Sequence, residues 1–197
     1  MKTLTSRAKQ AQKTKKHIYE CGIELIRNYG YDNVTVEDIA KQANVSIGTF
    51  YHYFVSKSDL LDEIFDRGDA YFREHAGGIF ESEKEDFQKI VEYFILYARL
   101  SIEEGLERVK SLYIPNNQMF ITHGRLMQDL LTAYIEQAQN RGTIEKERIA
   151  GEITDMLFLV ARGVIFDWCL HDGTYDLEER MQDIISRLVD SYRMVKR

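Results

Sequence analysis

The chain has 197 residues with 26 Lys and Arg against 32 Asp and Glu, and it contains one proline and two cysteines. Its length suits a small module joined to a larger one, and the many Glu, Lys, Leu, Ile and Ala residues predict an all-α protein. The two cysteines lie far apart, and the longest fully apolar run, Met156–Ala161, is too short to cross a bilayer, which excludes a disulfide framework and a membrane span. We expect a cytoplasmic protein without a signal peptide.

The N-terminal part is predicted to begin with a basic arm and one long helix. Residues 1–9 are basic and polar without a periodic apolar face, so we expect them to be disordered. A helix is expected from about Gln10 to Tyr29, where apolar side chains recur at helical spacing. Gly30 follows as the residue that ends this helix.

Two shorter helices are predicted over residues 35–54. In the first of them, apolar residues recur at i, i+3, i+4 and i+7, namely Val36, Ile39, Ala40 and Ala43. Thr35 precedes this stripe as a candidate N-cap, and Ser46 is placed to cap the second helix. Asn44, between the helices, tolerates the conformation of a tight turn. Helices this short are expected to pack on the preceding helix and form a three-helix unit.

The second short helix has the side chains of a DNA reader. Its hydroxyl groups can bond base edges or phosphates, its methyl groups suit thymine, and its Tyr and His donors suit phosphate oxygens. It carries no Arg or Lys, so we expect readout through methyl contacts and DNA shape rather than the usual guanine contact. Lys57 follows at the start of the next helix, where a bound phosphate would suit both its charge and the helix N-terminus. The candidate DNA-binding residues are Thr35, Ser46, Ile47, Gly48, Thr49, Tyr51, His52 and Lys57.

A series of short motifs marks the stretch from about residue 12 to residue 65. They are Gly30-Tyr31, Thr35-Val36, Asp38-Ile39-Ala40, Ala43, Val45-Ser46, Gly48-Thr49, Tyr51-His52-Tyr53-Phe54, Ser56-Lys57 and Leu60-Leu61. In order and without gaps, this stretch resembles the DNA-binding domain of TetR-family transcriptional regulators. The resemblance implies an N-terminal three-helix domain with a helix-turn-helix, a C-terminal helical domain for ligand binding and dimerisation, and about nine helices in total. It also implies a contact between Lys57 and a DNA phosphate.

Charge is divided unevenly along the chain. Residues 1–57 carry nine Lys and Arg against five Asp and Glu, a net charge of +4, and the remainder carries a net charge of −10. A basic N-terminal part on an acidic body would orient the molecule toward DNA with the basic part first. Double-stranded DNA is therefore the expected partner.

Three regions are expected along the chain. Residues 1–56 would hold the basic arm and the helix-turn-helix domain, residues 57–80 a connecting helix interrupted at Gly77-Gly78, and residues 81–197 the ligand-binding and dimerisation domain. Apolar spacing in the last region predicts five helices. We expect them to end near Glu104, Tyr113, Asn140, His171 and Met194.

The last two of these helices carry more apolar surface than one small domain can cover. The resemblance implies that they form a four-helix bundle between two subunits, and a C2 homodimer would match a palindromic operator. A monomer whose last helices pack internally is the alternative. The candidate interface residues are Ile153, Leu157, Val160, Val164, Met181, Ile184, Ile185 and Leu188.

The resemblance also implies a small-molecule pocket in the C-terminal domain. Aromatic and Met side chains with a few polar groups suit a small apolar or aromatic effector, although each of them is also explained as ordinary core. The candidate ligand-binding residues are Phe94, Tyr97, Tyr113, Phe120, His123, Met127, Arg162 and Trp168.

Sequence patterns for catalysis are missing from the chain, which has no HExxH, CxxC, GxSxG or P-loop motif. We therefore expect no enzyme activity, no metal and no cofactor. The favoured hypothesis is a ligand-responsive repressor. The alternatives are an effector-independent DNA-binding protein with an architectural or chromosome-organising role, and a small-molecule-binding or catalytic helical protein whose N-terminal domain is vestigial. Replacing Tyr51 and Lys57 by Ala should abolish duplex binding in the favoured hypothesis and is irrelevant to the last alternative.

Overall fold

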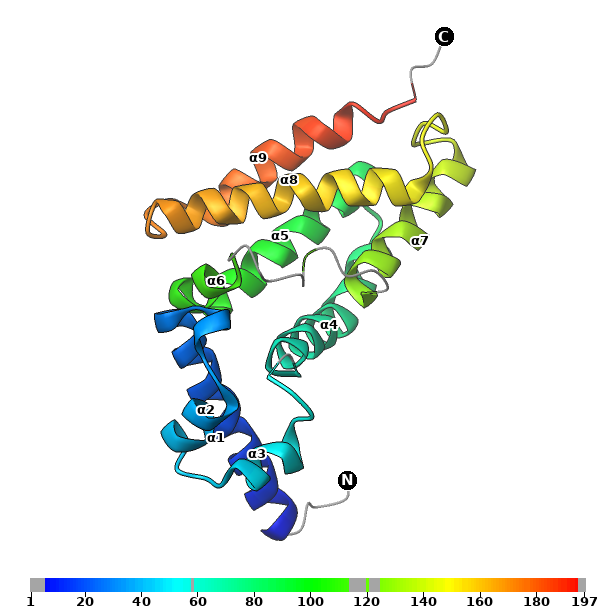
Figure 1. Cartoon of the computed structure of the whole chain (residues 1–197). Coiled ribbons are helices and arrows are strands. Elements are labelled where there is room, and N and C mark those ends of the chain that lie inside the picture. Colours follow the sequence, from blue (N-terminus) through cyan, green and yellow to red (C-terminus); the bar gives the residue numbers. More distant parts are fainter. Residues whose placement is uncertain (1–5, 58, 114–119, 121–124, 195–197) are drawn as a thin grey trace. The chain divides into compact units, whose positions relative to one another are not determined.

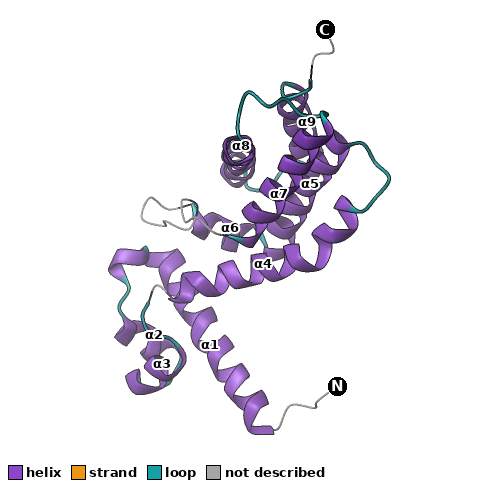
Figure 2. Ribbon diagram, turned by 90° about the vertical axis from the view of Figure 1, so that its right-hand side faces the viewer, coloured by secondary structure: helices purple, strands orange, loops and turns teal. Residues whose placement is uncertain are grey.

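The computed structural model describes residues 6–57, 59–113, 120 and 125–194. Within these residues the chain forms nine α-helices, one short 3-10 helix and no β-strand, which confirms the all-α prediction (Figure 1 and Figure 2). In the same residues, no helix combines the length and the apolar character that crossing a membrane requires. The chain divides into two compact units, Met1–Asp66 with Ser111–Ile121 and Arg67–Lys110 with Thr122–Arg197.

The first unit contains helices α1 (Ser6–Tyr29), α2 (Val36–Gln42) and α3 (Ile47–Tyr53), the 3-10 helix η1 (Tyr31–Asn33), and the start of α4 (Asp59–Phe80). Helix α1 begins at Ser6, so the expectation of disorder through residue 9 is wrong for residues 6–9. This stretch contains no glycine or proline, and Ala, Lys, Arg and Gln are all good helix formers.

The core of the first unit lies where α1, α2 and α3 meet. Ile18, Ile39, Phe50 and Leu60 are fully buried there. Gly22 of α1 allows the closest approach, because a Cβ atom at this position would lie only 2.6 Å from Leu60 Cδ1. The short helices are thus held by tertiary packing, as expected for segments that could not be stable alone.

The second unit contains the rest of α4 together with α5 (Asp86–Glu104), α6 (Leu106–Leu112), α7 (Leu126–Arg141), α8 (Ala150–Leu170) and α9 (Leu177–Asp190). Helix α9 packs against α5 and α8, and α8 packs against α7. Aromatic side chains fill much of this core, since Phe72, Tyr93, Phe94 and Phe158 are fully buried.

Helix α4 runs without a break through Gly77-Gly78, so the predicted interruption is wrong. Each glycine lowers the stability of the helix by about 1 kcal/mol relative to Ala, but it does not block the helix sterically. Buried Phe72 and Ala76 hold the helix on the core just before the glycines. The boundary between the two units falls between Asp66 and Arg67, inside α4 and inside the predicted connecting segment 57–80.

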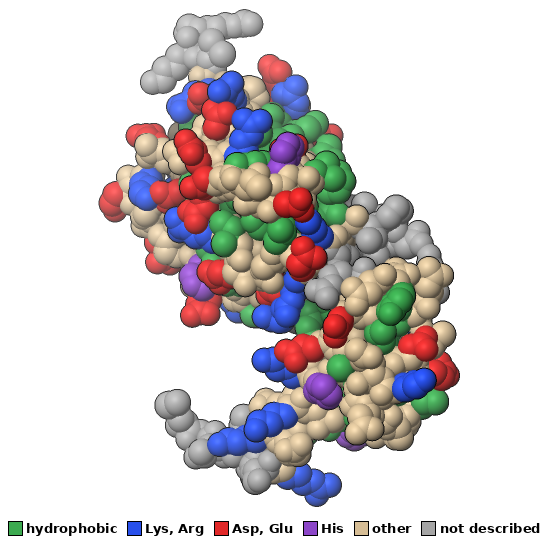
Figure 3. Space-filling view, turned by 90° about the vertical axis from the view of Figure 1, so that its left-hand side faces the viewer, with side chains coloured by type: hydrophobic (Ala, Val, Ile, Leu, Met, Phe, Trp, Pro, Cys, Tyr) green, Lys and Arg blue, Asp and Glu red, His purple; other side chains and the backbone are tan. Residues whose placement is uncertain are grey.

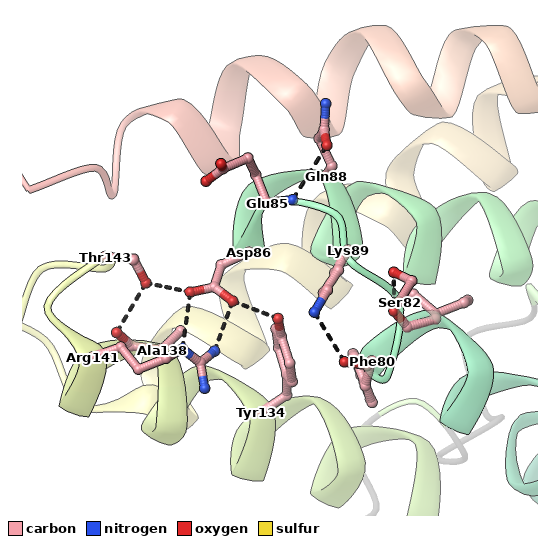
Figure 4. Close-up of polar contacts among 11 residues, drawn as sticks. Phe80, Ser82, Glu85, Asp86, Gln88, Lys89, Tyr134, Ala138, Arg141 and Thr143 are labelled. Carbon is pink, nitrogen blue, oxygen red and sulfur yellow. Dashed lines mark hydrogen bonds and ion pairs between the residues drawn. The ribbon is translucent and has the colours of Figure 1, made fainter.

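A buried carboxylate, Asp86, ties the start of α5 to the end of α7 (Figure 4). It accepts hydrogen bonds from Tyr134 Oη at 2.6 Å, Arg141 Nη2 at 2.7 Å and Thr143 Oγ1 at 2.5 Å. Burial raises the pKa of Asp86, but these hydrogen bonds and the charge of Arg141 outweigh burial and hold the pKa below its ordinary value. The cluster fixes one end of the second unit.

The last described residues, Tyr192 to Met194, are joined to the turn between α7 and α8. The Glu145 amide donates to the Tyr192 carbonyl at 2.9 Å, and the Met194 amide donates to the Thr143 carbonyl at 3.4 Å. Tyr192 is itself buried. Thr143 therefore connects the C-terminal segment to the Asp86 cluster.

Candidate functional site

The turn between α2 and α3 is built from two side-chain caps, as the sequence predicts. Thr35 Oγ1 accepts from the Asp38 amide at 3.1 Å while the Thr35 amide donates to Asp38 Oδ2 at 3.0 Å, which forms a capping box. Ser46 Oγ accepts from the Thr49 amide at 3.0 Å and caps α3. Asn44 adopts a left-handed conformation with φ of 52°. These local contacts fix the start of α3 relative to α2.

The outward face of α3 carries the side chains that the sequence assigns to DNA. Ile47 and Tyr51 are exposed by 42% and 53%, and His52 is also exposed, whereas Phe50 and Phe54 lie in the core. Ser46 Oγ and Thr49 Oγ1 lie 2.8 Å apart in a hydrogen bond that leaves lone pairs for an incoming donor. Ser46 and α3 together thus present two hydroxyl groups, an aliphatic side chain and two aromatic donors outside the core.

Lys57 is held inside the first unit by two backbone carbonyl groups. Its Nζ donates to the Tyr31 carbonyl at 2.5 Å and to the Val34 carbonyl at 2.8 Å, and it lies 4.0 Å from the centroid of the Tyr31 ring. Two of the three ammonium donors are therefore committed to η1 and the residue after it. The phosphate contact predicted for Lys57 stays a prediction, and the structure adds a structural role that the sequence did not indicate.

The basic residues of the first unit lie within residues 1–57, whereas its stretch 58–66 carries acids and no Lys or Arg. Lys and Arg side chains gather near the N-terminal segment of the first unit in Figure 3, and Asp and Glu side chains spread over the visible face of the second unit among hydrophobic ones. In the first unit, the side-chain hydrogen bond from Thr35 is the main reason that the pKa of Asp38 is lowered. Asp38 is therefore charged at neutral pH, where it stabilises the start of α2.

The structure brings together some of the predicted ligand residues. Phe94 and Tyr97 both lie against Phe158, with ring centroids 5.1 and 5.8 Å apart. Met127 is buried nearby, and its carbonyl accepts a hydrogen bond of 2.5 Å from Tyr93 Oη. These side chains form an aromatic cluster in the core of the second unit.

Other predicted ligand residues lie elsewhere or outside this description. Trp168 lies near the end of α8, where its Nε1 donates to the Tyr175 carbonyl at 3.2 Å. Tyr113 and Phe120 contact each other, with ring centroids 4.9 Å apart, and belong to the segment grouped with the first unit. His123 lies outside the described residues.

Two arginines accompany the aromatic cluster. The charges of Arg125 and Arg162 both act on buried Tyr97, lowering its pKa, although burial of Tyr97 is the larger effect and raises it. Arg162 was among the predicted ligand residues, and Arg125 was not. No local pattern marks Arg125, because Asp69 of α4 and Tyr97 of α5, which act on it, lie far away in the sequence.

The single chain already buries most of the predicted dimer interface. Five of the eight residues lie in the core of the second unit: Ile153, Leu157, Val164, Met181 and Ile185. Val160, Ile184 and Leu188 instead line a shallow groove on the surface of α8 and α9.

A different face of α8 is exposed and apolar. Met156, Leu159, Phe166 and Leu170 point away from the core, and Gly163 lies between them with no atom within 4 Å of its Cβ position. Their 3-4-3-4 spacing is that of a coiled-coil seam. This spacing is visible in the sequence, but the apolar residues on the other sides of α8 conceal it.

Comparison with known proteins agrees with a helix-turn-helix domain in the N-terminal part of the chain. Residues 8–64 match the family model described as bacterial regulatory proteins, tetR family. The chain is 27% identical over 196 residues to the fatty acid metabolism regulator protein of Bacillus subtilis, covering 92% of this chain and 96% of that protein.

Solved structures share the fold along almost the whole chain. FadR from Bacillus subtilis in complex with stearoyl-CoA has a TM-score of 0.70 at 21% identity, covering 90% of this chain and 99% of that one. Thermus thermophilus FadR in complex with lauroyl-CoA has a TM-score of 0.66 at 21% identity, covering 93% and 96%. With a helix-turn-helix domain that matches the TetR-family model over residues 8–64 and relatives aligned along more than nine-tenths of its length, the chain is similar to the TetR family of DNA-binding transcriptional regulators.

Proposed function

We propose that this regulator is a repressor that binds a palindromic operator as a homodimer and is released by a fatty acyl-CoA or a similar acyl compound. The proposal of DNA binding rests on the outward face of α3. The hydroxyl and aromatic donors of this face belong to a helix whose start is fixed by two side-chain caps. Ser46, Thr49 and Tyr51 are proposed to bond base edges and phosphates, and Ile47 to contact thymine methyl groups.

The effector class is supported by two relatives and by the core of the second unit. Two FadR proteins of the same fold bind stearoyl-CoA and lauroyl-CoA. In this chain, buried Phe94, Tyr97 and Phe158 provide an aromatic environment that suits an acyl chain. We therefore propose an acyl chain as the apolar part of the effector, a narrower class than the small apolar or aromatic compound that the sequence suggests.

Dimerisation is proposed through the exposed seam of α8 with the neighbouring face of α9. The seam consists of Met156, Leu159, Gly163, Phe166 and Leu170, and it would be extended by Val160, Ile184 and Leu188. Gly163 in the middle would let two copies of α8 approach closely where they cross. The two copies of α3 would then be related by a two-fold axis, as a palindromic operator requires.

The proposed response is a shift between two conformations of the second unit. Helix α4 belongs to both units, so a change in how the second unit holds α4 is transmitted along the chain to the DNA-binding helix α3. The effector must bind the released conformation more tightly, because equal affinity for both conformations would change nothing.

The test is binding of the full-length protein to duplex DNA from the upstream region of its own gene, titrated with salt and with lauroyl-CoA. Specific binding with a steep salt dependence that lauroyl-CoA reverses is the expected result. Tight binding at many unrelated sequences without any response to acyl compounds would instead support the architectural alternative. Failure to bind specific DNA at low salt would overturn the repressor.

A further inference from the structure

Two hydroxyl groups lie side by side at the start of α3, and their hydrogen-bonding capacity can be counted. Ser46 Oγ accepts from the Thr49 amide at 3.0 Å and lies 2.8 Å from Thr49 Oγ1. Each hydroxyl group offers one donor and two acceptor lone pairs. One of the two hydroxyl protons is used between the pair, whichever group donates it. Within the part of the chain that the structure describes, the pair therefore keeps a single O–H donor for a partner, and the Thr49 oxygen atom keeps at least one free lone pair.

This capacity matches adenine better than the other three bases. The major-groove edge of adenine carries an acceptor, N7, next to a donor, the N6 amino group, so one donor and one acceptor satisfy both. Guanine carries two acceptors, N7 and O6, and needs two donors at once, as an Arg or Lys side chain provides. Thymine and cytosine would each leave one member of the hydroxyl pair without a partner on the base. A donor and an acceptor side by side therefore favour adenine.

The other side chains of α3 do not supply the second donor that guanine needs. Helix α3 contains neither Arg nor Lys. Tyr51 lies two positions after Thr49, about 200° around the helix axis, and His52 lies about 4.5 Å further along that axis. Successive bases of one strand are about 3.4 Å apart, so His52 is placed for a neighbouring base or a phosphate rather than for the base that Ser46 and Thr49 meet.

The two residues between the hydroxyl groups suit the same base pair. Ile47 is aliphatic and yet 42% exposed, and every A·T pair displays a thymine methyl group in the major groove. Gly48 lies in α3 without a positive φ, so its backbone conformation does not require glycine. A Cβ atom there would lie 3.7 Å from Ser46 Oγ, an ordinary contact, so packing among the described residues does not require glycine either. Glycine is a poor helix former, but without a side chain it leaves Ser46 Oγ open to a base edge.

We propose that Ser46 and Thr49 read one adenine in each operator half-site: Ser46 Oγ donates to N7, and Thr49 Oγ1 accepts from the N6 amino group. Ile47 contacts the methyl group of the paired thymine. This inference rests on the proposed function and names the base pair that this face of α3 recognises. Guanine at the same position leaves one acceptor without a donor, and binding is weaker for that reason.

The experiment selects duplexes from a randomised DNA library with the full-length protein and then alters single atoms in one selected half-site. The wild type is expected to select half-sites with an A·T position that becomes degenerate in Thr49→Val. Changing that pair to G·C should weaken wild-type binding about 5- to 100-fold. Replacing the adenine by 7-deazaadenine, which lacks the N7 acceptor, or by purine, which lacks the amino group, should weaken it about 2- to 10-fold. Replacing the thymine by uracil, which lacks the methyl group, should weaken it about fourfold.

Variants assign each atom of the base pair to a side chain. Thr49→Val keeps the shape of the side chain and the amide that Ser46 caps, and it should bind the purine-substituted and the normal site equally. Thr49→Ser, which keeps a hydroxyl group, should keep the preference for adenine. Ile47→Ala should lose only the effect of uracil. Thr14→Val is the matched control and should keep every preference, because the Thr14 hydroxyl group donates to the Gln10 carbonyl at 3.1 Å within α1.

Gly48→Ala tests the close approach separately. An added methyl group should weaken binding to the A·T site about tenfold or more without lowering the midpoint of thermal unfolding, since Ala is the better helix former. Binding as tight as that of the wild type would contradict a base edge next to Ser46.

The inference is overturned if the position that Thr49→Val loosens is a G·C pair, or if Thr49→Val selects the same sequence as the wild type. It is also overturned if neither altered purine weakens binding, a result that would assign the hydroxyl groups to phosphates. A library that yields no specific sequence rejects the repressor and the base contact together. Specific binding with an intact preference for adenine that lauroyl-CoA does not reverse rejects the ligand-responsive repressor and keeps the base contact.

Discussion

Lys57 places its ammonium group 4.0 Å from the centroid of the Tyr31 ring and 2.5 Å from the Tyr31 carbonyl oxygen, across 26 residues of sequence. Replacing Lys57 by Met should remove this contact and a second hydrogen bond to Val34, leaving two carbonyl groups without their donor. We expect a loss of about 1–3 kcal/mol in the free energy of unfolding, measured by urea denaturation.

The control for this variant is Lys16→Met, since Lys16 forms only an exposed pair with Glu20 at 3.7 Å and should cost under about 1 kcal/mol. Equal stability of the two variants would contradict the structural role of Lys57. A stability loss also means that weak DNA binding by Lys57→Ala does not by itself demonstrate a phosphate contact.

Tyr51→Phe isolates one proposed DNA contact without disturbing the fold. Tyr51 is exposed, so removing its hydroxyl group should leave the unfolding free energy unchanged. Affinity for operator DNA should fall about 2- to 10-fold, the value of one neutral hydrogen bond, with an unchanged salt dependence. Fluorescence anisotropy with a labelled duplex measures both quantities. Tyr29→Phe, exposed on α1, is the matched control, and an equal effect at Tyr29 would argue against a contact specific to Tyr51.

Asp86→Asn should destabilise the second unit by about 2–4 kcal/mol at pH 7, because it removes the charge that Arg141 pairs with in a buried cluster. The pKa of Asp86 is lowered in the folded protein, so its contribution to stability is complete above the unfolded pKa of about 3.9 and is lost as pH falls through the lower folded value. The difference in unfolding free energy between the variant and the wild type should therefore become smaller below about pH 4.

Urea denaturation at pH 7, 5 and 3.5 measures this dependence, provided that the unfolding of both proteins stays reversible. Asp190→Asn is the control, since Asp190 pairs with Arg193 on the surface and should cost under about 1 kcal/mol at every pH. A difference for Asp86→Asn that stayed constant down to pH 3.5 would show that the carboxylate is not the stabilising form.

Leu159→Glu should dissociate the proposed dimer while leaving each chain folded. Leu159 is 58% exposed in the single chain, so the substitution costs little there, but a two-fold interface would lose the side chain twice. We expect dimerisation to weaken by about 3–6 kcal/mol, seen as a monomer in sedimentation at micromolar concentration. Ile102→Glu, on an exposed position of α5, should remain dimeric. A dimeric Leu159→Glu protein would place the interface elsewhere.

Local rules explain which parts of this fold the sequence could predict. The caps at Thr35 and Ser46 and the turn at Asn44 depend on residues three or four positions apart, and all three are confirmed. The split of α3 into buried Phe50 and exposed Tyr51 follows from helical periodicity alone.

Contacts between distant segments explain what could not be predicted. The partners of Lys57 and of Asp86 lie 23 to 57 residues away, and no pattern in the sequence joins them. Periodicity is also silent on α8, because apolar residues on nearly every side of a helix do not say which face the chain buries itself. Leu157, which is predicted from the sequence to lie at the interface, lies in the core of the single chain, and the interface itself stays a prediction.

The hydrogen bonds that join Tyr192 and Met194 to the turn before α8 bear on how the protein can be handled. An exopeptidase trimming from the carboxyl end would meet backbone groups already paired with Thr143 and Glu145, and digestion should slow there. Removing Tyr192 would take away the carbonyl group that the Glu145 amide bonds and loosen the turn whose Thr143 hydroxyl bonds Asp86. Affinity tags and fluorescent fusions attached beyond Met194 therefore need a flexible spacer, so that the pairing stays intact.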